Sequence, residues 1–201
     1  HLHDLKIPNK RVPEYTKEER ARLQKAFGYT YEDFRESILP MAQNGSEQIG
    51  AMGIDTPLAV LSNRHQPLFN YFKQLFAQVT NPPIDAIREA VVTSTTVFLG
   101  KSGNLLEEKA ENCKMLRVSN PILTSTDLLK IKNMNVEGFK VAVIPTTYYK
   151  GTSLPKAIDH VCLEADRAHL DGANILILSD RGVDENRVAI PSLLAVSALQ
   201  Q

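Results

Sequence analysis

Residues 139–179, FKVAVIPTTYYKGTSLPKAIDHVCLEADRAHLDGANILILS, decide the fold class of this chain. Phe139–Pro145 and Asn174–Ser179 are apolar runs of strand length, and Ser153–Leu170 between them has apolar residues at helical spacing. Strands that are apolar along their whole length are typical of a parallel sheet that is covered on both faces. The order strand, helix, strand therefore predicts a right-handed βαβ crossover.

Helices are expected to flank this sheet. The inward residues of the helix between the strands are predicted to be Ile158, Val161, Cys162, Ala165 and Leu170. After the second strand, Pro191 is expected to start a closing helix, because proline is well tolerated in the first turn of a helix.

Two further helices are expected at the start of the chain. Thr16 and Glu19 have the spacing of a capping box, which predicts a helix that ends near Gly28. A second helix is predicted over residues 30–44, where apolar residues again recur at helical spacing. Residues 1–44 are therefore expected to form an N-terminal helical segment.

The middle of the chain is expected to combine a glycine-rich loop with helices and short strands. The loop is residues 45–57, the predicted helices are 67–79, 84–92 and 124–131, and the predicted strands are 91–99 and 113–118. The aromatic residues of 67–79 are expected to be heavily buried. The predicted fold class is α/β: a partly parallel sheet with flanking helices in residues 45–201, preceded by the N-terminal helical segment.

Composition excludes several classes of protein. The chain has 201 residues, 43% of them apolar, which suits one globular domain or a large part of one. Lysine plus arginine and aspartate plus glutamate number 23 each and are spread along the chain, which argues against a nucleic-acid partner. No apolar run approaches the roughly 20 residues of a spanning helix, and the first residues lack a signal-peptide layout, so a cytoplasmic protein without membrane contact is expected.

Three short patterns are weak candidates for chemistry. Gly100-Lys101-Ser102 has the tail of a phosphate-binding loop, but Thr95 stands where that loop requires glycine. His160 and His169 lie about 180° apart on one predicted helix, so they do not form a metal-binding pair. The two cysteines are too few and too far apart for a metal site or a disulfide framework, and reduced thiols are expected at Cys113 and Cys162.

Asp180 is better placed than these candidates. It directly follows the second predicted strand, and α/β proteins build their sites in the loops after the carboxyl ends of parallel strands. Asp180 could instead serve structure alone, as a helix cap or in an ion pair with Arg181. Both interpretations stay open on the sequence alone.

The densest unusual stretch is QVTNPPID at residues 78–85. Pro82 and Pro83 hold the backbone extended and push Asn81 out of the helical region, which predicts a rigid corner. Thr80 and Asn81 place a hydroxyl and an amide at this corner. It could hold a small polar molecule, or it could serve structure alone, with Asp85 near the start of the next helix as its cap.

Longer stretches carry a family resemblance. AMGIDTPLAVLS at residues 51–62, YFKQLFAQVTNPPID at 71–85 and Arg88-Glu89 resemble, at identical spacing, the central domain of the glutamate synthase large subunit. Weaker similarity continues through GNLL at 103–106, NPIL at 120–123, LSDR at 178–181 and AIPSLLA at 189–195, and covers most of the chain from about Tyr29. The family usually has serine where Ala51 stands.

The resemblance implies a role between two active sites. Members of the family make two glutamates from glutamine and 2-oxoglutarate, and the central domain joins the glutaminase (amidotransferase) domain to a synthase domain with FMN and an iron-sulfur cluster. It also lines part of the intramolecular ammonia tunnel, and by position Thr80 and Asn81 are the tunnel-lining residues. The resemblance further implies that residues 1–201 are an incomplete central domain without catalytic residues, FMN or a cluster of their own.

The same resemblance implies the partners of the chain. These are the amidotransferase and FMN-binding domains of the same polypeptide, with a small subunit or ferredoxin in the full enzyme. Two other hypotheses remain beside it: a free-standing small α/β enzyme with a site near Asp180, and a pure structural scaffold.

Overall fold

The computed structural model describes residues 1–46, 53, 55–76 and 83–201. Contacts divide the chain into two compact units, one made of His1–Pro13 with Glu89–Gln201 and the other of Glu14–Arg88. The expected boundary between residues 44 and 45 lies inside the second unit. Each unit is described here by itself.

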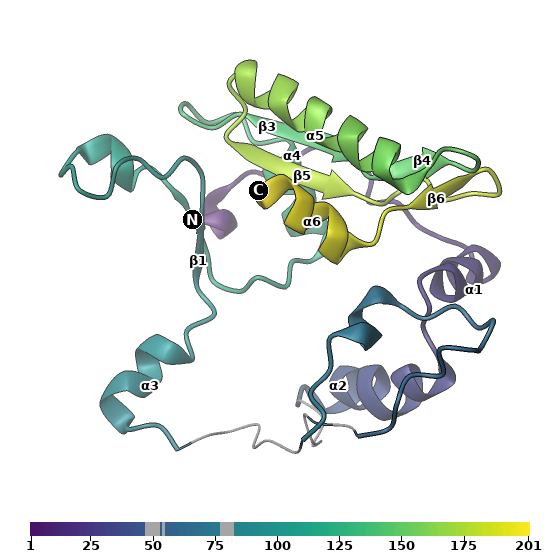
Figure 1. The fold of residues 1–201 in the computed structure, drawn as a ribbon. Helices are drawn as coiled ribbons and strands as arrows, with labels where there is room; N and C mark the ends of the chain where they lie inside the picture. The colour runs from purple at the N-terminus through teal and green to yellow at the C-terminus, as the bar shows by residue number, and fades with distance from the viewer. Residues whose placement is uncertain (47–52, 54, 77–82) are drawn as a thin grey trace. The chain divides into compact units, whose positions relative to one another are not determined.

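The first unit is built on the predicted strand, helix, strand arrangement (Figure 1). Strands β3 (Val141–Pro145) and β5 (Ile175–Ser179) are parallel neighbours, and helix α5 (Leu154–Leu170) connects them through the chain. Val141 lies opposite Ile175, and Pro145 lies opposite Ser179. The α/β class with a partly parallel sheet is confirmed.

Both faces of this small sheet are covered. On one face, Ile144 of β3 packs with Ala157, Val161 and Ala165 of α5. On the other face, Ile175 of β5 belongs to a second cluster, whose other buried members are Leu116, Val118 and Ile131. Because successive side chains of a strand point to opposite faces, the continuous apolar runs of β3 and β5 supply both clusters.

A second, antiparallel pair of strands extends this unit. β4 (Thr147–Tyr149) pairs with β6 (Arg187–Ala189), and α6 (Ser192–Gln200) follows. Thr146, which is 3% exposed, links the two pairs: its N–H donates to the carbonyl of Ser179 at 2.8 Å, and its carbonyl accepts from the N–H of Ile190 at 2.9 Å. Neither β4 nor β6 was expected from the sequence.

The rest of the first unit covers the second cluster. β1 (Val97–Leu99) and β2 (Leu116–Val118) form an antiparallel pair, and α4 (Ser125–Lys132) packs beside them. The 3-10 helix Ala110–Cys113 lies in the connection between β1 and β2. Leu2, which begins the 3-10 helix Leu2–Asp4, and Leu5, which follows that helix, also pack against this cluster, so the first residues of the chain are part of this fold.

The second unit contains the helices expected at the start of the chain. They are α1 (Lys17–Ala26) and a π-helical segment (Asp33–Ile38) that runs into α2 (Leu39–Asn44). Further along the chain lie a 3-10 helix (Leu68–Tyr71) and α3 (Ala86–Val92), which crosses the unit boundary. The capping box of Thr16 and Glu19 is present, and Gly45 ends α2 with a left-handed backbone at φ 62°. Two opening helices are thus confirmed.

Four expectations are wrong in the described residues. Of the predicted helix 67–79, the structure describes residues 67–76, and within these only Leu68–Tyr71 is helical. Phe72, which was expected to be buried, is 72% exposed. The predicted strand 91–99 forms only from Val97, because α3 continues to Val92. Leu170 is 84% exposed, since at 100° per residue it points about 140° away from Ala165.

Candidate functional site

Thr80 and Asn81, the predicted tunnel-lining residues, lie outside the described residues. The structure does describe both sides of the corner that contains them. Before it, the chain is described as far as Phe76, and after it from Pro83 onward. The geometry of these two flanks is therefore what the structure adds to the candidate site.

The flank before the corner is paired with the glycine-rich stretch. Gly53 and Gln74 form a parallel β-bridge, and the ammonium of Lys73 donates to the carbonyl of Thr56. These contacts bring together the two stretches, 51–62 and 71–85, that carry the strongest family resemblance. This pairing also explains why the helical spacing after Pro67 does not give a long helix: Gln74 takes part in a bridge, and tertiary contacts override local propensity.

Gln74 has one further property of interest. Its side-chain oxygen Oε1 is buried, yet it accepts no hydrogen bond from the described part of the chain. Buried polar atoms without a partner are rare in proteins. The glutamine nevertheless remains partly exposed as a whole residue.

The flank after the corner is a helix start. The carboxylate of Asp85 accepts the backbone N–H of Arg88 at 3.0 Å and also accepts from the Arg88 guanidinium. These hydrogen bonds lower the pKa of Asp85 below its ordinary value, and the one from the guanidinium has the largest effect. Asp85 therefore caps α3, as the structural alternative predicted.

Asp180 is exposed, and in the described part of the chain it makes no ion pair with Arg181. The turn after β5 is instead organised by Asp184. Its Oδ1 accepts the backbone N–H groups of Asn186 and Arg187, each at 2.8 Å, and its Oδ2 accepts from the Arg187 guanidinium at 2.8 and 3.0 Å. Of the alternatives for Asp180, the ion pair with Arg181 is therefore absent from the described residues, where Arg187 pairs with Asp184 instead.

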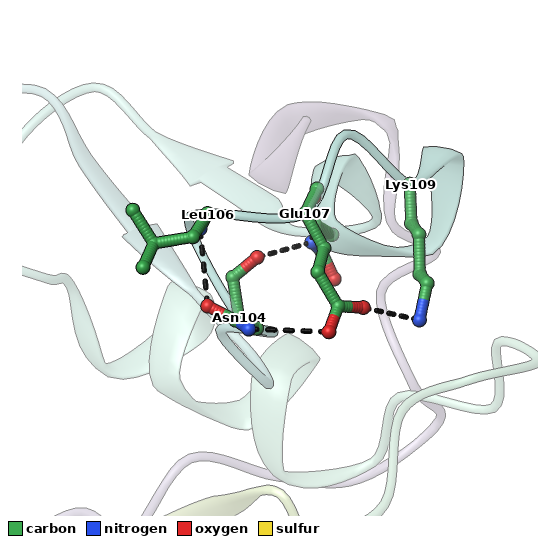
Figure 2. A network of polar contacts seen from close by, with 5 residues as sticks. Asn104, Leu106, Glu107 and Lys109 are labelled. Atoms are coloured by element: carbon green, nitrogen blue, oxygen red, sulfur yellow. Dashed lines mark hydrogen bonds and ion pairs between the residues drawn. The ribbon is translucent and has the colours of Figure 1, made fainter.

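A second polar cluster holds the loop between β1 and β2 (Figure 2). The side-chain amide of Asn104 accepts the N–H of Leu106 at 3.0 Å and donates to the carboxylate of Glu107 at 3.2 Å. Glu107 also pairs with Lys109, and these contacts lower its pKa below the ordinary value, the Lys109 contact most. The first four residues after Gly103 thus form a closed turn.

Asn112 locks this turn from the other side. Its Nδ2 donates to the carbonyls of Asn104 and Glu107, at 2.9 and 2.8 Å. A Cβ built on Gly103 would lie 1.7 Å from Oδ1 of Asn112, so only glycine fits at residue 103 while that amide stays in place. Gly103 and Asn112 therefore fit each other closely in this loop.

The remaining candidates do not assemble into a site. His160 and His169 are both exposed on α5, and within residues 1–46, 53, 55–76 and 83–201 no three His, Cys, Asp or Glu side chains cluster as metal ligands. Cys113 and Cys162 are free thiols, as predicted. Among the described helices, none has the length and apolarity that crossing a membrane requires.

Sequence reasoning missed Asp184 and the Asn104–Asn112 cluster. Asp184 has an available signal, because an aspartate followed two and three residues later by Asn186 and Arg187 has the spacing of a side-chain-capped turn. The cluster around Asn104 has a weaker one, since its contacts depend on the path of the loop.

The structure is that of an α/β domain. The polar residues described above cap helices or hold loops and turns. The family model described as "Glutamate synthase central domain" matches residues 22–201, and the chain belongs to this family. Its relatives include the NADPH glutamate synthase large chain of Bacillus subtilis, 46% identical over 178 residues, and the ferredoxin-dependent glutamate synthase 2 of Synechocystis, 46% identical over 182 residues. The NADH glutamate synthase of Schizosaccharomyces pombe is 44% identical over 179 residues.

The lengths of these relatives differ greatly from the matched segment. The matches cover 89%, 88% and 87% of this chain, but only 12%, 12% and 8% of the Bacillus, Synechocystis and Schizosaccharomyces proteins. The chain therefore spans about a tenth of the length of the relatives it matches.

Proposed function

We propose that this chain is the central connecting domain of a glutamate synthase large subunit. It joins the glutaminase (amidotransferase) domain to the FMN and iron-sulfur synthase domain and helps to line the ammonia tunnel between them. The observation that carries the proposal is the family match over residues 22–201, in relatives that are glutamate synthases of three kinds, NADPH, NADH and ferredoxin-dependent. The small fraction of each relative that is matched supports a connecting part of a larger enzyme.

In this proposal the chemistry belongs to the neighbouring domains. Glutamine is hydrolysed in the amidotransferase domain, ammonia passes through the tunnel, and the synthase domain forms glutamate from 2-oxoglutarate with its FMN and iron-sulfur cluster. Residues 1–201 supply no catalytic residue and hold no cofactor. The enzyme works in the cytoplasm, with a small subunit or ferredoxin as electron-delivering partner and no nucleic-acid or membrane partner.

Thr80 and Asn81 are assigned to the wall of the tunnel. Support comes from their place in the motif at residues 71–85 and from the contacts at its ends. The stretch before the corner is paired with residue 53, and the stretch after it is fixed by the cap that Asp85 gives to α3.

The alternative of a free-standing enzyme with a site near Asp180 is not favoured. Asp180 is an exposed side chain, and among the described residues it belongs to no group of three or more His, Cys, Asp or Glu side chains that could hold a metal ion. The hypothesis of a pure scaffold differs from the proposal only in having no tunnel role. The experiment below distinguishes the two.

The test is Thr80→Val in the full-length polypeptide, with glutamine hydrolysis and glutamate formation measured in the same reaction. Valine keeps the shape of threonine but removes the hydroxyl, and loss of one hydrogen-bonding group is worth about 1 kcal/mol, or roughly a fivefold effect. We expect a decrease of roughly that size in the glutamate formed per glutamine hydrolysed.

The matched control is Thr152→Val, at an exposed threonine in the turn before α5, which should leave the ratio unchanged. An unchanged ratio in Thr80→Val as well would reject the tunnel role and favour the scaffold. A reading frame that does not continue into amidotransferase and synthase domains would reject the connecting role itself.

A further inference from the structure

Asn44 and Gly45 form the only Asn-Gly pair in the sequence, and they stand where α2 ends. Asn44 is the last residue of the helix, and Gly45 follows it with a left-handed backbone, at φ 62° and ψ 20°. Both residues are exposed, as is Ser46 after them. The proposed connecting role makes no use of this pair.

The side-chain amide of Asn44 is not held by the fold. Among the contacts of the described residues it makes no hydrogen bond, whereas Asn174 donates to the carbonyl of Gly138 at 2.7 Å and accepts the N–H of Lys140 at 3.0 Å. Asn112 is likewise fixed by the two hydrogen bonds that it donates. An amide that is held in this way cannot turn toward the backbone nitrogen that follows it, but the amide of Asn44 can.

Gly45 leaves its own backbone nitrogen open for attack on the side-chain carbonyl carbon of Asn44. Glycine has no Cβ to crowd that nitrogen, and nothing lies within 4 Å of the place where a Cβ on Gly45 would stand. Because the two groups belong to neighbouring residues, the attack is intramolecular and has a high effective concentration. One contact opposes it: the N–H of Gly45 donates to the carbonyl of Met41 at 2.9 Å, and this hydrogen bond must open first.

The end of α2 gives only modest protection against this attack. The helix has six residues and continues from a π-helical segment, and no residue of Asp33–Asn44 is buried. Helix ends fray, and a single exposed hydrogen bond contributes little to stability, so its opening should slow the reaction only roughly fivefold.

We propose that Asn44 is a site of spontaneous deamidation in the folded protein. The nitrogen of Gly45 gives its proton to solvent and bonds to the side-chain carbonyl carbon of Asn44. The bond from that carbon to the amide nitrogen breaks, and this nitrogen takes a proton from water and leaves as ammonia. Water then opens the cyclic imide at either carbonyl, which yields aspartate or isoaspartate. The new carboxylate at the C-terminal end of α2 opposes the helix dipole, so the modification should loosen this helix end.

Isoelectric focusing followed by peptide mapping tests the proposal on chain 1–201. The formal net charge of the chain at pH 7 is zero, so deamidation produces a separate, more acidic species. During incubation at mildly alkaline pH we expect this species to accumulate, with both aspartate and isoaspartate at residue 44. The rate should rise with the hydroxide concentration, and it should be roughly fivefold lower than in the same chain denatured by urea. The control is Asn44→Gln, which should lack the acidic species because its longer side chain closes the ring much less readily.

Three results would overturn the proposal. An acidic species that forms equally fast in Asn44→Gln comes from another residue. An Asn44 that stays intact in the folded chain while it reacts in the denatured chain shows that α2 protects it. Aspartate without isoaspartate at residue 44 shows direct hydrolysis of the side chain instead of attack by the nitrogen of Gly45.

Discussion

Asp184 organises the turn between β5 and β6 through four hydrogen bonds, two from backbone N–H groups and two from the guanidinium of Arg187. The bond from the N–H of Asn186 lowers the pKa of Asp184 most, followed by those from Arg187. A carboxylate whose pKa is lower in the folded state than in the unfolded state stabilises the fold only while it is ionised. One residue thus makes this turn sensitive to acid.

Acid should remove the stabilisation that Asp184 gives to the fold. The stabilisation by Asp184 is present above the unfolded aspartate pKa of about 4 and is lost as the pH falls through the lower folded value. We expect the urea midpoint of unfolding to fall as the pH is lowered from about 5 toward 3, and to fall less steeply in Asp184→Asn, which has no charge to lose. Urea unfolding across this pH range checks the slope. An acid slope in Asp184→Asn equal to that of the unaltered chain would contradict the role given to Asp184.

Two helices of the first unit begin in chemically different ways. The hydroxyl of Thr124 accepts the N–H of Asp127 at 3.1 Å, and the Asp127 carboxylate accepts from the N–H of Thr124 at 3.3 Å, so α4 has a complete capping box. Ser153 occupies the equivalent position of α5, but its side chain makes no capping hydrogen bond. The two positions therefore form a matched pair for mutagenesis.

Thr124→Ala should destabilise the chain by about 1 kcal/mol, the usual effect of losing a side-chain N-cap. Ser153→Ala should change the free energy of unfolding by much less, since its hydroxyl caps nothing in α5. Equilibrium unfolding in urea of both variants measures the difference. Equal losses in the two variants would show that the capping box of α4 contributes nothing beyond the residue type.

Elements that depend on local chemistry or a long apolar pattern could be predicted from the sequence. β3, α5 and β5 follow from their apolar runs, and the helix starts at Thr16 and Thr124 follow from residues three positions apart. The pairing of β4 with β6 could not be predicted, because each strand has three residues and the partners are far apart in the chain. Such short pairings are decided by tertiary contacts.

The same distinction between local and distant contacts applies to the candidate site around Thr80 and Asn81. The cap that Asp85 gives to α3 follows from a short-range pattern. The bridge between Gly53 and Gln74 joins two segments through the fold and has no local signal, so the helical spacing after Pro67 was misleading. Thr80 and Asn81 lie outside the described residues, and their tunnel role remains a prediction.

The two units differ in how much apolar surface they bury. The first unit holds two clusters of buried residues, but among the described residues of Glu14–Arg88 none is buried. Exposed large apolar side chains are instead frequent there, with Phe69, Tyr71, Phe72, Leu75 and Phe76 each between 57% and 72% exposed. Large exposed apolar patches are typical of surfaces that bind other proteins or domains. This difference agrees with the proposed place of the chain within a larger polypeptide.

The most direct test of the connecting role compares the visible absorption spectrum of chain 1–201 with that of the full-length polypeptide. Glutamine hydrolysis is assayed on the same two samples. We predict an FMN spectrum and glutaminase turnover for the full-length polypeptide, and neither for residues 1–201. Both proteins are purified and measured at the same molar concentration. An FMN spectrum or glutamine hydrolysis in chain 1–201 would contradict the claim that this domain connects the two active sites and contributes to neither reaction.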